Sequence, residues 1–230
     1  MTRHRRSRTR LRGFTLIELL VAIAVMALLA IMSWRGLDGM ARTQSQLKGR
    51  ADAVLTLQAT LSQWGADLDA AVPLASTLPI DWDGRALRIT RRGSDGPAAT
   101  VFVVAWTLRT DDTGTRWHRW QSAPVTTRGD WRLAWNQAAA WANNSAENAQ
   151  GTDVALMPVQ EWQIQYFRNG QWGPAQSSDA TSGTASAPAS TTTNALPDGI
   201  RLLLVLPPGP ALSGTLTRDW VRPTLATAKS

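Results

Sequence analysis

An unbroken apolar run near the N-terminus limits what this chain can fold into. The run extends from Leu19 to Met32, and with its apolar neighbours it forms a segment over residues 14–34. A helix of about 20 residues is about 30 Å long, which is enough to span the hydrocarbon core of a bilayer. We therefore expect residues 14–34 to form a transmembrane helix.

A basic segment, residues 1–13, precedes the apolar run. It carries six of the 24 basic residues and no acidic residue, so the remaining 18 basic and 17 acidic side chains give residues 14–230 a formal charge of +1, against +7 for the whole chain. Such a segment either binds nucleic acid or forms the positive end of an export signal. Because an apolar helix follows directly, the positive-inside rule favours the export signal, with a cytoplasmic N-terminus and an external head.

Glu18 is the only charged residue in the apolar segment. A carboxylate at membrane depth costs about 3 kcal/mol on insertion scales, which makes Glu18 a candidate for a functional role. The alternative is a structural carboxylate near the membrane interface, favoured by the helix dipole. Two other interpretations of the segment are a conventional secretory signal peptide, cut near Ala30, and a plain signal anchor.

The residues at the start of the run read Arg12-Gly13-Phe14-Thr15-Leu16-Ile17-Glu18-Leu19-Leu20. This pattern resembles the class III signal of type IV pilins and type II secretion pseudopilins, in which a basic leader ends in glycine, phenylalanine follows, and glutamate is the fifth mature residue. The resemblance implies that a prepilin peptidase cleaves between Gly13 and Phe14 and then N-methylates Phe14. It also implies that Glu18 is an assembly residue, which neutralises the N-terminal amine of a neighbouring subunit in the apolar core of a filament.

Helical spacing continues beyond the apolar segment. Positions 37, 40, 44, 47, 51, 54, 58, 61, 65, 68 and 72 follow one another at steps of three and four and are mostly apolar, and the first proline that interrupts the pattern is Pro73. We therefore predict one helix over residues 14–72. Its first half, 14–34, is apolar, and its second half, 35–72, is amphipathic and packs on a head formed by residues 73–230.

Residues 73–230 carry the alternation and turn motifs of a β-rich head. Turns are expected at 81–84, 111–114 and 169–170, and strands at 85–91, 100–108, 115–121, 131–135, 159–168, 199–206 and 215–221. Residues 137–149 are predicted to be a short helix or a loop, and the Ser/Thr/Ala-rich residues 175–195 a mobile surface loop. The fold class is therefore α+β.

Several segments of the head and helix are similar to the J-type minor pseudopilin of type II secretion. They are Trp34–Met40, Leu68–Val72, Asp83–Arg85, Val159–Phe167 with the following Asn169–Trp172, and Leu196–Arg201. The resemblance implies a pilin-like fold, in which a long N-terminal α-helix, partly transmembrane, packs on a β-rich globular head with two antiparallel sheets.

The same resemblance implies partners and a location. J-type subunits form a tip complex with I-type and K-type minor pseudopilins, and an H-type minor pseudopilin links this tip to a shaft of G-type major pseudopilins. The tip initiates the pseudopilus in the inner membrane, with the heads in the periplasm, and the filament exports folded proteins through the outer membrane. The alternative is a type IV minor pilin with a role in pilus assembly, adhesion or DNA uptake.

The composition excludes several kinds of chemistry. The chain has no cysteine and only two histidines, His4 and His118, which excludes disulfides, zinc fingers, thiol catalysis and histidine-rich metal sites. We expect His118 on a strand surface, and we expect Asp111 and Asp112 to form a turn rather than a calcium site. No nucleotide-binding or nucleophile motif is present, so we expect neither enzymatic activity nor a cofactor.

The chain has twelve tryptophans, ten of them beyond residue 80. We expect those of the head to fill the core and pack across strands, and some to lie at interfaces with partner heads. Arginine and tryptophan also alternate over residues 116–132, a pattern that is compatible with stacking on single-stranded nucleic acid. The near-neutral charge of residues 14–230 argues against a nucleic-acid partner.

Overall fold

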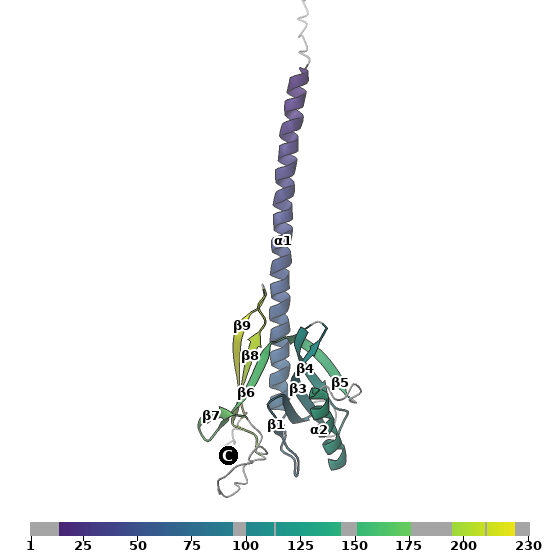
Figure 1. Ribbon diagram of the computed structural model, residues 1–230, viewed down its shortest axis with the longest axis vertical. Coiled ribbons are helices and arrows are strands. Elements are labelled where there is room, and N and C mark those ends of the chain that lie inside the picture. Colours follow the sequence, from purple (N-terminus) through teal and green to yellow (C-terminus); the bar gives the residue numbers. More distant parts are fainter. Residues whose placement is uncertain are drawn as a thin grey trace, which may run out of the picture. The chain divides into compact units, whose positions relative to one another are not determined.

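The computed structural model describes residues 14–93, 100–112, 114–143, 151–175, 195–209 and 211–223. The chain divides into two compact units, Met1–Gly49 and Arg50–Ser230, and one helix, α1 (Leu16–Asp69), belongs to both. Among the described residues, a second helix and nine strands follow it (Figure 1). The fold is α+β, a long N-terminal helix and a β-rich head with two antiparallel sheets, as the sequence predicts.

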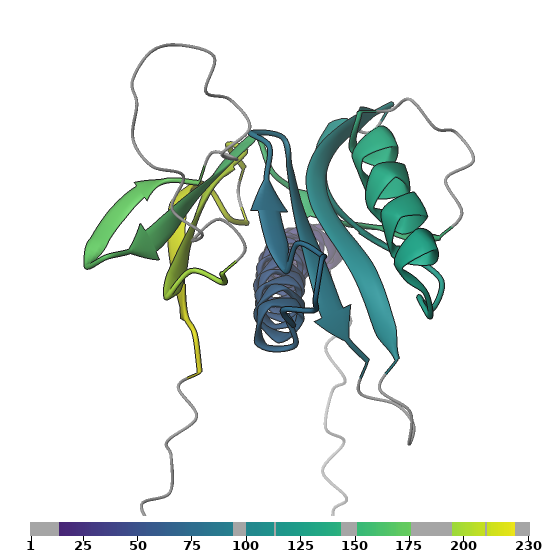
Figure 2. The same cartoon turned by 90° about the horizontal axis from the view of Figure 1, so that it is seen from below.

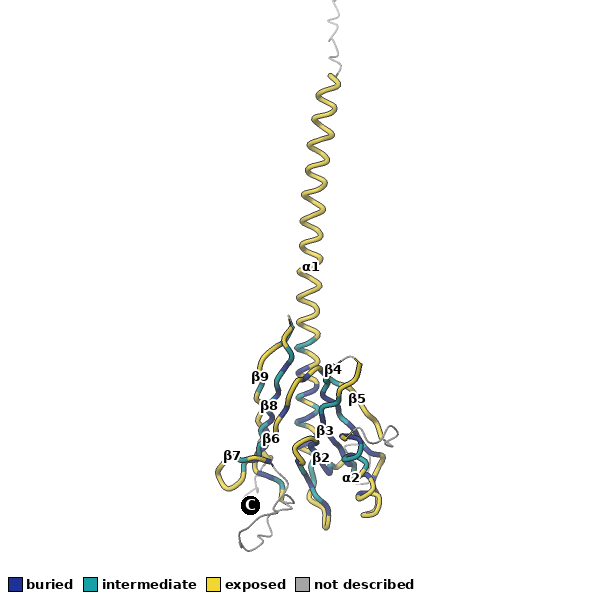
Figure 3. The backbone as a smooth tube through the Cα atoms, in the orientation of Figure 1, coloured by how far each residue is buried: buried dark blue, intermediate teal, exposed yellow. Residues whose placement is uncertain are grey.

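In the first unit, the described residues form only the N-terminal part of α1. Every residue from Phe14 to Gly49 is solvent-exposed, which Figure 3 shows as a continuous yellow helix. The large apolar side chains of this part have no protein core to pack against. Such a helix requires a lipid or protein environment that the isolated chain does not supply.

The part of α1 in the second unit packs on the head through a face that differs from the predicted one. The helix buries Leu57, Thr60, Trp64, Asp67 and Leu68. Of the predicted face, Gln58 is exposed and Gly65 is only half-buried. The prediction was wrong because the face is centred on Trp64 and includes two polar residues, Thr60 and Asp67, that an apolar pattern does not reveal.

Helix α1 ends at Asp69, three residues before the predicted end. Ala71 forms an isolated β-bridge with Arg91, and the backbone N–H of Val72 donates to the Thr90 carbonyl at 2.9 Å. The chain therefore leaves the helix to pair with a strand before it reaches Pro73.

The five-stranded sheet is antiparallel, with the strand order β1-β2-β3-β4-β5. Its strands are β1 (Ile80–Trp82), β2 (Ala86–Arg92), β3 (Val101–Asp111), β4 (Gly114–Gln121) and β5 (Thr152–Pro158). The predicted strands at 85–91, 100–108 and 115–121 are confirmed, and Asp111 and Gly114 pair across the predicted turn. Strand β5 was not predicted.

The four-stranded sheet is also antiparallel, with the strand order β7-β6-β8-β9. Its strands are β6 (Glu161–Arg168), β7 (Gln171–Pro174), β8 (Gly199–Leu206) and β9 (Gly214–Val221). The turn at Asn169-Gly170 is confirmed, and both of its residues have the positive φ of a type I′ hairpin turn, 52° and 79°. The buried alternation of Trp162, Ile164 and Tyr166 along β6 is confirmed as well.

The head has two apolar cores, one on each face of the five-stranded sheet. Figure 2 shows the end of α1 between the two sheets, where it shares the larger core with both of them. Helix α2 (Arg128–Ala142) covers the opposite face of the five-stranded sheet and forms the smaller core with it. Each sheet is therefore buried on the face that lies toward α1, and the five-stranded sheet is buried on both faces.

Helix α2 corrects the predicted strand at 131–135. Thr127 caps the helix: its hydroxyl accepts from the Asp130 N–H at 3.1 Å, and the Asp130 carboxylate accepts from the Thr127 N–H at 3.0 Å. Trp131 and Trp135, four residues apart, both face the sheet. Their aromatic character indicated a strand, but the capping box and the four-residue spacing favour a helix. Residues 137–142 of the predicted short helix continue α2.

We expect Thr127→Ala to lower the free energy of unfolding by about 1 kcal/mol. The change removes the hydroxyl that accepts from the Asp130 N–H and leaves that donor without its cap. Thermal unfolding of the full chain in detergent, followed by tryptophan fluorescence, measures the effect. The matched control is Asn136→Ala, an exposed change in the same helix. A Thr127→Ala variant as stable as this control would contradict the capping role.

One buried carboxylate fastens α1 to the five-stranded sheet. Asp67 is fully buried and accepts hydrogen bonds from Trp106 Nε1 at 2.9 Å, from Arg119 Nε at 2.8 Å and from Arg119 Nη2 at 2.9 Å. Gln63 Nε2 donates to it at 3.0 Å, and Arg91 Nη1 completes the set. The last turns of the helix are thereby bound to β2, β3 and β4 through polar contacts in an apolar core.

Two predictions fall largely outside the described residues. Of the predicted mobile loop at 175–195, the structure describes only Ala175 and Ala195. Residues 144–149 of the predicted short helix or loop also lie outside the described part of the chain.

Candidate functional site

The predicted cleavage site lies at the boundary of the described chain. Gly13 is outside the described residues, whereas Phe14 is described and is 88% exposed. Helix α1 begins two residues later, at Leu16. The residues after the predicted scissile bond are thus a short exposed segment that leads directly into the helix.

Glu18 and Thr15 form a reciprocal cap at the start of α1. Glu18 Oε2 accepts from the Thr15 backbone N–H at 3.1 Å and from its hydroxyl at 2.9 Å. The Glu18 N–H in turn points to Thr15 Oγ1 at 3.4 Å. This is a capping box, in which the fourth residue returns to the first. Thr15 had no predicted role, although the spacing Thr15-x-x-Glu18 is the usual signature of such a box.

The cap gives Glu18 a defined position in the single subunit. Its carboxylate is turned back toward the N-terminal end of the helix, beside the residue that follows Phe14. An amine at the N-terminus of another chain would have to compete with Thr15 or share this carboxylate with it. The geometry therefore favours a role for Glu18 at the end of the helix rather than on its flank.

Helix α1 is the one helix in the described residues that is long and apolar enough to cross a membrane. Length and composition alone support this conclusion, and none of its most apolar window is buried within the chain. Trp34, at the predicted end of the membrane segment, is 74% exposed. The helix is thus compatible with membrane anchoring.

His118 is buried, not on a strand surface as predicted. Its side chain lies toward α2, with Nδ1 3.0 Å from Asp153 Oδ1, and its Nε2 has no hydrogen-bond partner among the described residues. The prediction was wrong because the five-stranded sheet is buried on both faces: Trp117 belongs to the core shared with α1, while the next residue, His118, lies on the opposite face with Trp120 and α2.

Asp153 gathers the polar groups around His118. It accepts from Arg109 Nη1 at 2.8 Å and from Trp141 Nε1 at 3.1 Å. Burial acts to raise the pKa of Asp153, but the hydrogen bonds from His118 and Trp141 and the charges of His118 and Arg109 outweigh it, so the pKa lies below its ordinary value. The cluster fastens the end of α2 to β3, β4 and β5.

The tryptophans largely fill the two cores, as predicted. Ten of the twelve are buried, while Trp172 is half-buried and Trp34 is exposed. In the segment of alternating arginine and tryptophan, Trp117, Trp120 and Trp131 are all buried. These three rings are therefore not available for stacking on bases.

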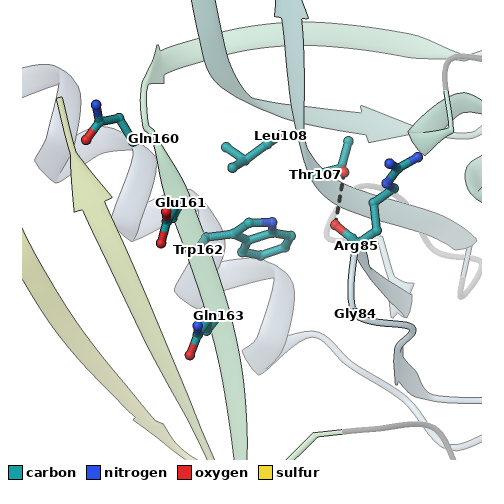
Figure 4. Close-up of a pocket in the computed structure, with 8 residues that line it drawn as sticks. All are labelled: Gly84, Arg85, Thr107, Leu108, Gln160, Glu161, Trp162 and Gln163. Carbon is teal, nitrogen blue, oxygen red and sulfur yellow. Dashed lines mark hydrogen bonds between the residues drawn. The ribbon is translucent and has the colours of Figure 1, made fainter.

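A groove of about 360 Å³ lies at the junction of the two sheets (Figure 4). The Trp162 ring points into it from β6, toward Thr107 and Arg85. The Thr107 hydroxyl donates to the Arg85 carbonyl at 3.0 Å, and Arg85 Nη1 donates to Asn143 at 2.8 Å, so both polar groups serve the protein itself.

Among the described residues, no group of three or more histidine, aspartate or glutamate side chains is positioned to hold a metal ion. Asp111 ends β3 at the predicted hairpin turn, and Asp112 follows it. The site with the clearest chemical signature is therefore the N-terminal segment around Phe14 and Glu18.

Comparison with known families identifies this segment. The family described as "Prokaryotic N-terminal methylation motif" matches residues 8–34, which include the end of the basic leader, the predicted cleavage site and the apolar first part of α1. The N-terminus is a prepilin-type signal. Such a motif indicates a type IV pilin-like or pseudopilin substrate, and it implies processing by a prepilin peptidase. No curated protein matches the chain.

Proposed function

We propose that the chain is a J-type minor pseudopilin of the type II secretion system. In this role it joins I-type and K-type minor pseudopilins in the pseudopilus tip, and it contacts the H-type minor and G-type major pseudopilins below the tip. The proposal rests on one observation above all: a prepilin-type signal leads into a long helix that ends in a head of two antiparallel sheets. The similar segments named above support the J-type assignment.

The proposed role is assembly, not catalysis. A subunit of this kind is anchored in the inner membrane by α1, with a cytoplasmic N-terminus and a periplasmic head, before it enters the filament. The exposed apolar surface of residues 14–34 fits both environments, because lipid and the apolar core of a helical filament satisfy the same side chains. A type IV minor pilin would use the same signal and remains the competing assignment.

Co-purification from cells tests the assignment. The full-length chain is produced with full-length I-type and K-type minor pseudopilins from the same genome, extracted in mild detergent and captured by an affinity tag. We expect both partners to be captured together with the chain. Capture of type IV minor pilins instead, with no I-type or K-type subunit, would overturn the assignment in favour of the pilin.

We expect Glu18→Gln to disrupt assembly as strongly as Glu18→Ala. Glutamine can still accept from Thr15, so this variant keeps the cap and removes only the charge. If the carboxylate neutralises the amine of a neighbour in an apolar environment, both variants leave that amine unpaired. Recovery in the co-purification measures the effect, and we expect a loss of about tenfold or more.

Thr15→Ala is the matched control for the cap, because it removes the capping hydroxyl and keeps the Glu18 charge. We expect it to assemble nearly as well as the unchanged chain. If Glu18→Gln assembled normally while Thr15→Ala failed, the cap rather than the charge would be the function of Glu18.

A further inference from the structure

Strand β9 is the one described edge strand that is neither short, nor ended by proline, nor bulged. The described edges of the two sheets are β1, β5, β7 and β9. Strand β1 has three residues, β7 has four and ends in Pro174, and β5 has a register shift against β4 and ends in Pro158. Short length, proline and bulges all keep an edge from pairing. By contrast, β9 has eight residues, no proline and an unbroken register with β8.

The backbone of β9 presents a row of hydrogen-bonding groups to its free side. The N–H of Arg222 donates to the Asp198 carbonyl at 2.9 Å, so Asp198 and Arg222 form a hydrogen-bonded pair next to the Gly199–Val221 pair. Antiparallel pairs alternate between hydrogen-bonded and non-hydrogen-bonded, so even-numbered residues of β9 bond to β8. The odd-numbered residues therefore direct their N–H and C=O groups away from β8. They are all exposed: Thr215, Thr217, Asp219 and Val221.

The side chains of β9 place opposite charges on opposite faces. Asp219 lies on the outer face, where it accepts from Arg201 Nε and Nη2, each at 2.8 Å. Arg218 lies on the inner face with the buried Trp220, yet it is exposed and forms no ion pair with a described residue. A charge on the inward face of an edge strand opposes pairing with most strands, so Arg218 favours an added strand that brings an acidic side chain beside it.

We propose that the free edge of β9 binds an extended segment of a different pilin-like subunit, which adds a fifth strand to the four-stranded sheet and places an acidic side chain beside Arg218. This inference rests on the proposed function and deepens it, because it assigns the surface by which the head joins a neighbour. Backbone pairing supplies affinity in this mode of recognition, and the side chains supply specificity.

A second copy of this chain is a poorer occupant than a different subunit. When two identical edges pair about a two-fold axis, residues that lie opposite each other are on the same face of the sheet. The only acid of β9, Asp219, is on the face opposite to Arg218, so a second β9 cannot bring a carboxylate beside Arg218. A different subunit can carry an acid at the required position, where side chains of a non-hydrogen-bonded pair lie closest.

Proline at position 217 tests the edge without breaking the sheet. The Thr217 N–H points to the free side, so Thr217→Pro removes a group that the added strand needs and leaves the bonds to β8 in place. Thr217→Ala is the matched control, because it shortens the side chain and keeps the N–H. In the detergent co-purification of full-length chains, we expect Thr217→Pro to capture about tenfold less I-type or K-type subunit than Thr217→Ala, with an unchanged melting temperature.

A crosslink provides a second measurement if the proline variant is unstable. The chain has no cysteine, so Thr217→Cys introduces a single thiol on β9. We expect a short cysteine-to-amine crosslinker to join this variant to the co-purified I-type or K-type subunit. A crosslink only to a second copy of the chain would overturn the proposed occupant.

The outcomes separate this inference from the proposed function. If the unchanged chain captures I-type and K-type subunits and Thr217→Pro captures as much as Thr217→Ala, the edge is not the docking surface, while the proposed function stands. If the unchanged chain captures neither subunit, the proposed function fails and this inference fails with it.

Discussion

Replacement of Asp67 by asparagine is expected to lower the free energy of unfolding of the head by about 3–5 kcal/mol. Each described side chain that forms a hydrogen bond with the carboxylate is a donor: Gln63, Arg91, Trp106 and Arg119. Whichever way the asparagine amide is turned, its NH₂ group faces a donor, and two nearly buried guanidinium groups lose their counter-charge. The side chain keeps its volume, so the loss reports the polar contacts and not a cavity.

Thermal unfolding of the full chain in detergent, followed by tryptophan fluorescence, measures this loss. We expect a fall in melting temperature of about 10 °C for a chain of this size. Asp52→Asn is the matched control, because Asp52 is exposed in the same helix. If Asp67→Asn and Asp52→Asn had the same melting temperature, the Asp67 cluster would not be what fastens α1 to the sheet.

A double variant shows whether Asp67→Asn destabilises the head by leaving a buried cation without its counter-charge or only by removing hydrogen bonds. Arg119→Leu alone removes one of the two guanidinium groups, and we expect it to be destabilising. In the Asp67→Asn background the same change removes a cation that has already lost its partner, so we expect the two losses to be far less than additive. If the losses in free energy of unfolding were fully additive, an unpaired buried cation would not be the cause of the Asp67→Asn effect.

The elements that the sequence predicted well are those whose signals are local. The hairpin at Asn169-Gly170 needs two residues with positive φ, and this dipeptide supplies them. Strand β8 is apolar except for Arg201 and has turn residues at both ends, and its predicted bounds match the structure. The signal around Phe14 and Glu18 is equally local, since leader, glycine and apolar run are adjacent in the chain.

The elements that the sequence missed depend on contacts between distant residues. Asp67 is fixed by partners 24, 39 and 52 residues away in the chain, so no local pattern marks it as a buried site. Strand β5 is mostly exposed and weakly alternating, because it is held by its pairing with β4 and not by burial. The aromatic residues of α2 indicated a strand at 131–135. The Thr127 cap and the packing of the helix on the five-stranded sheet favour a helix instead.

The second large effect concerns processing: we expect Gly13→Val to leave the leader attached. By resemblance to prepilin signals, Gly13 precedes the scissile bond, and a residue without a side chain lets the backbone approach the peptidase closely. A β-branched side chain at this position would block that approach. Intact mass of the purified chain is the measurement, with an N-terminus at Phe14 expected for the unchanged chain and retention of residues 1–13 for the variant.

An uncleaved chain should also fail to enter the filament. It keeps six arginines at the start of an apolar helix and lacks the free amine at Phe14, so Glu18 has no cation to neutralise in a neighbour. Arginines drawn into an apolar core are costly, which holds the variant at the membrane surface. Gly36→Val, the same substitution within α1 where no atom lies within 4 Å of an added Cβ, should be cleaved normally. An unchanged chain that began near Ala30 instead would show that a conventional signal peptidase removes the apolar segment, and the assembly role of Glu18 would fall with it.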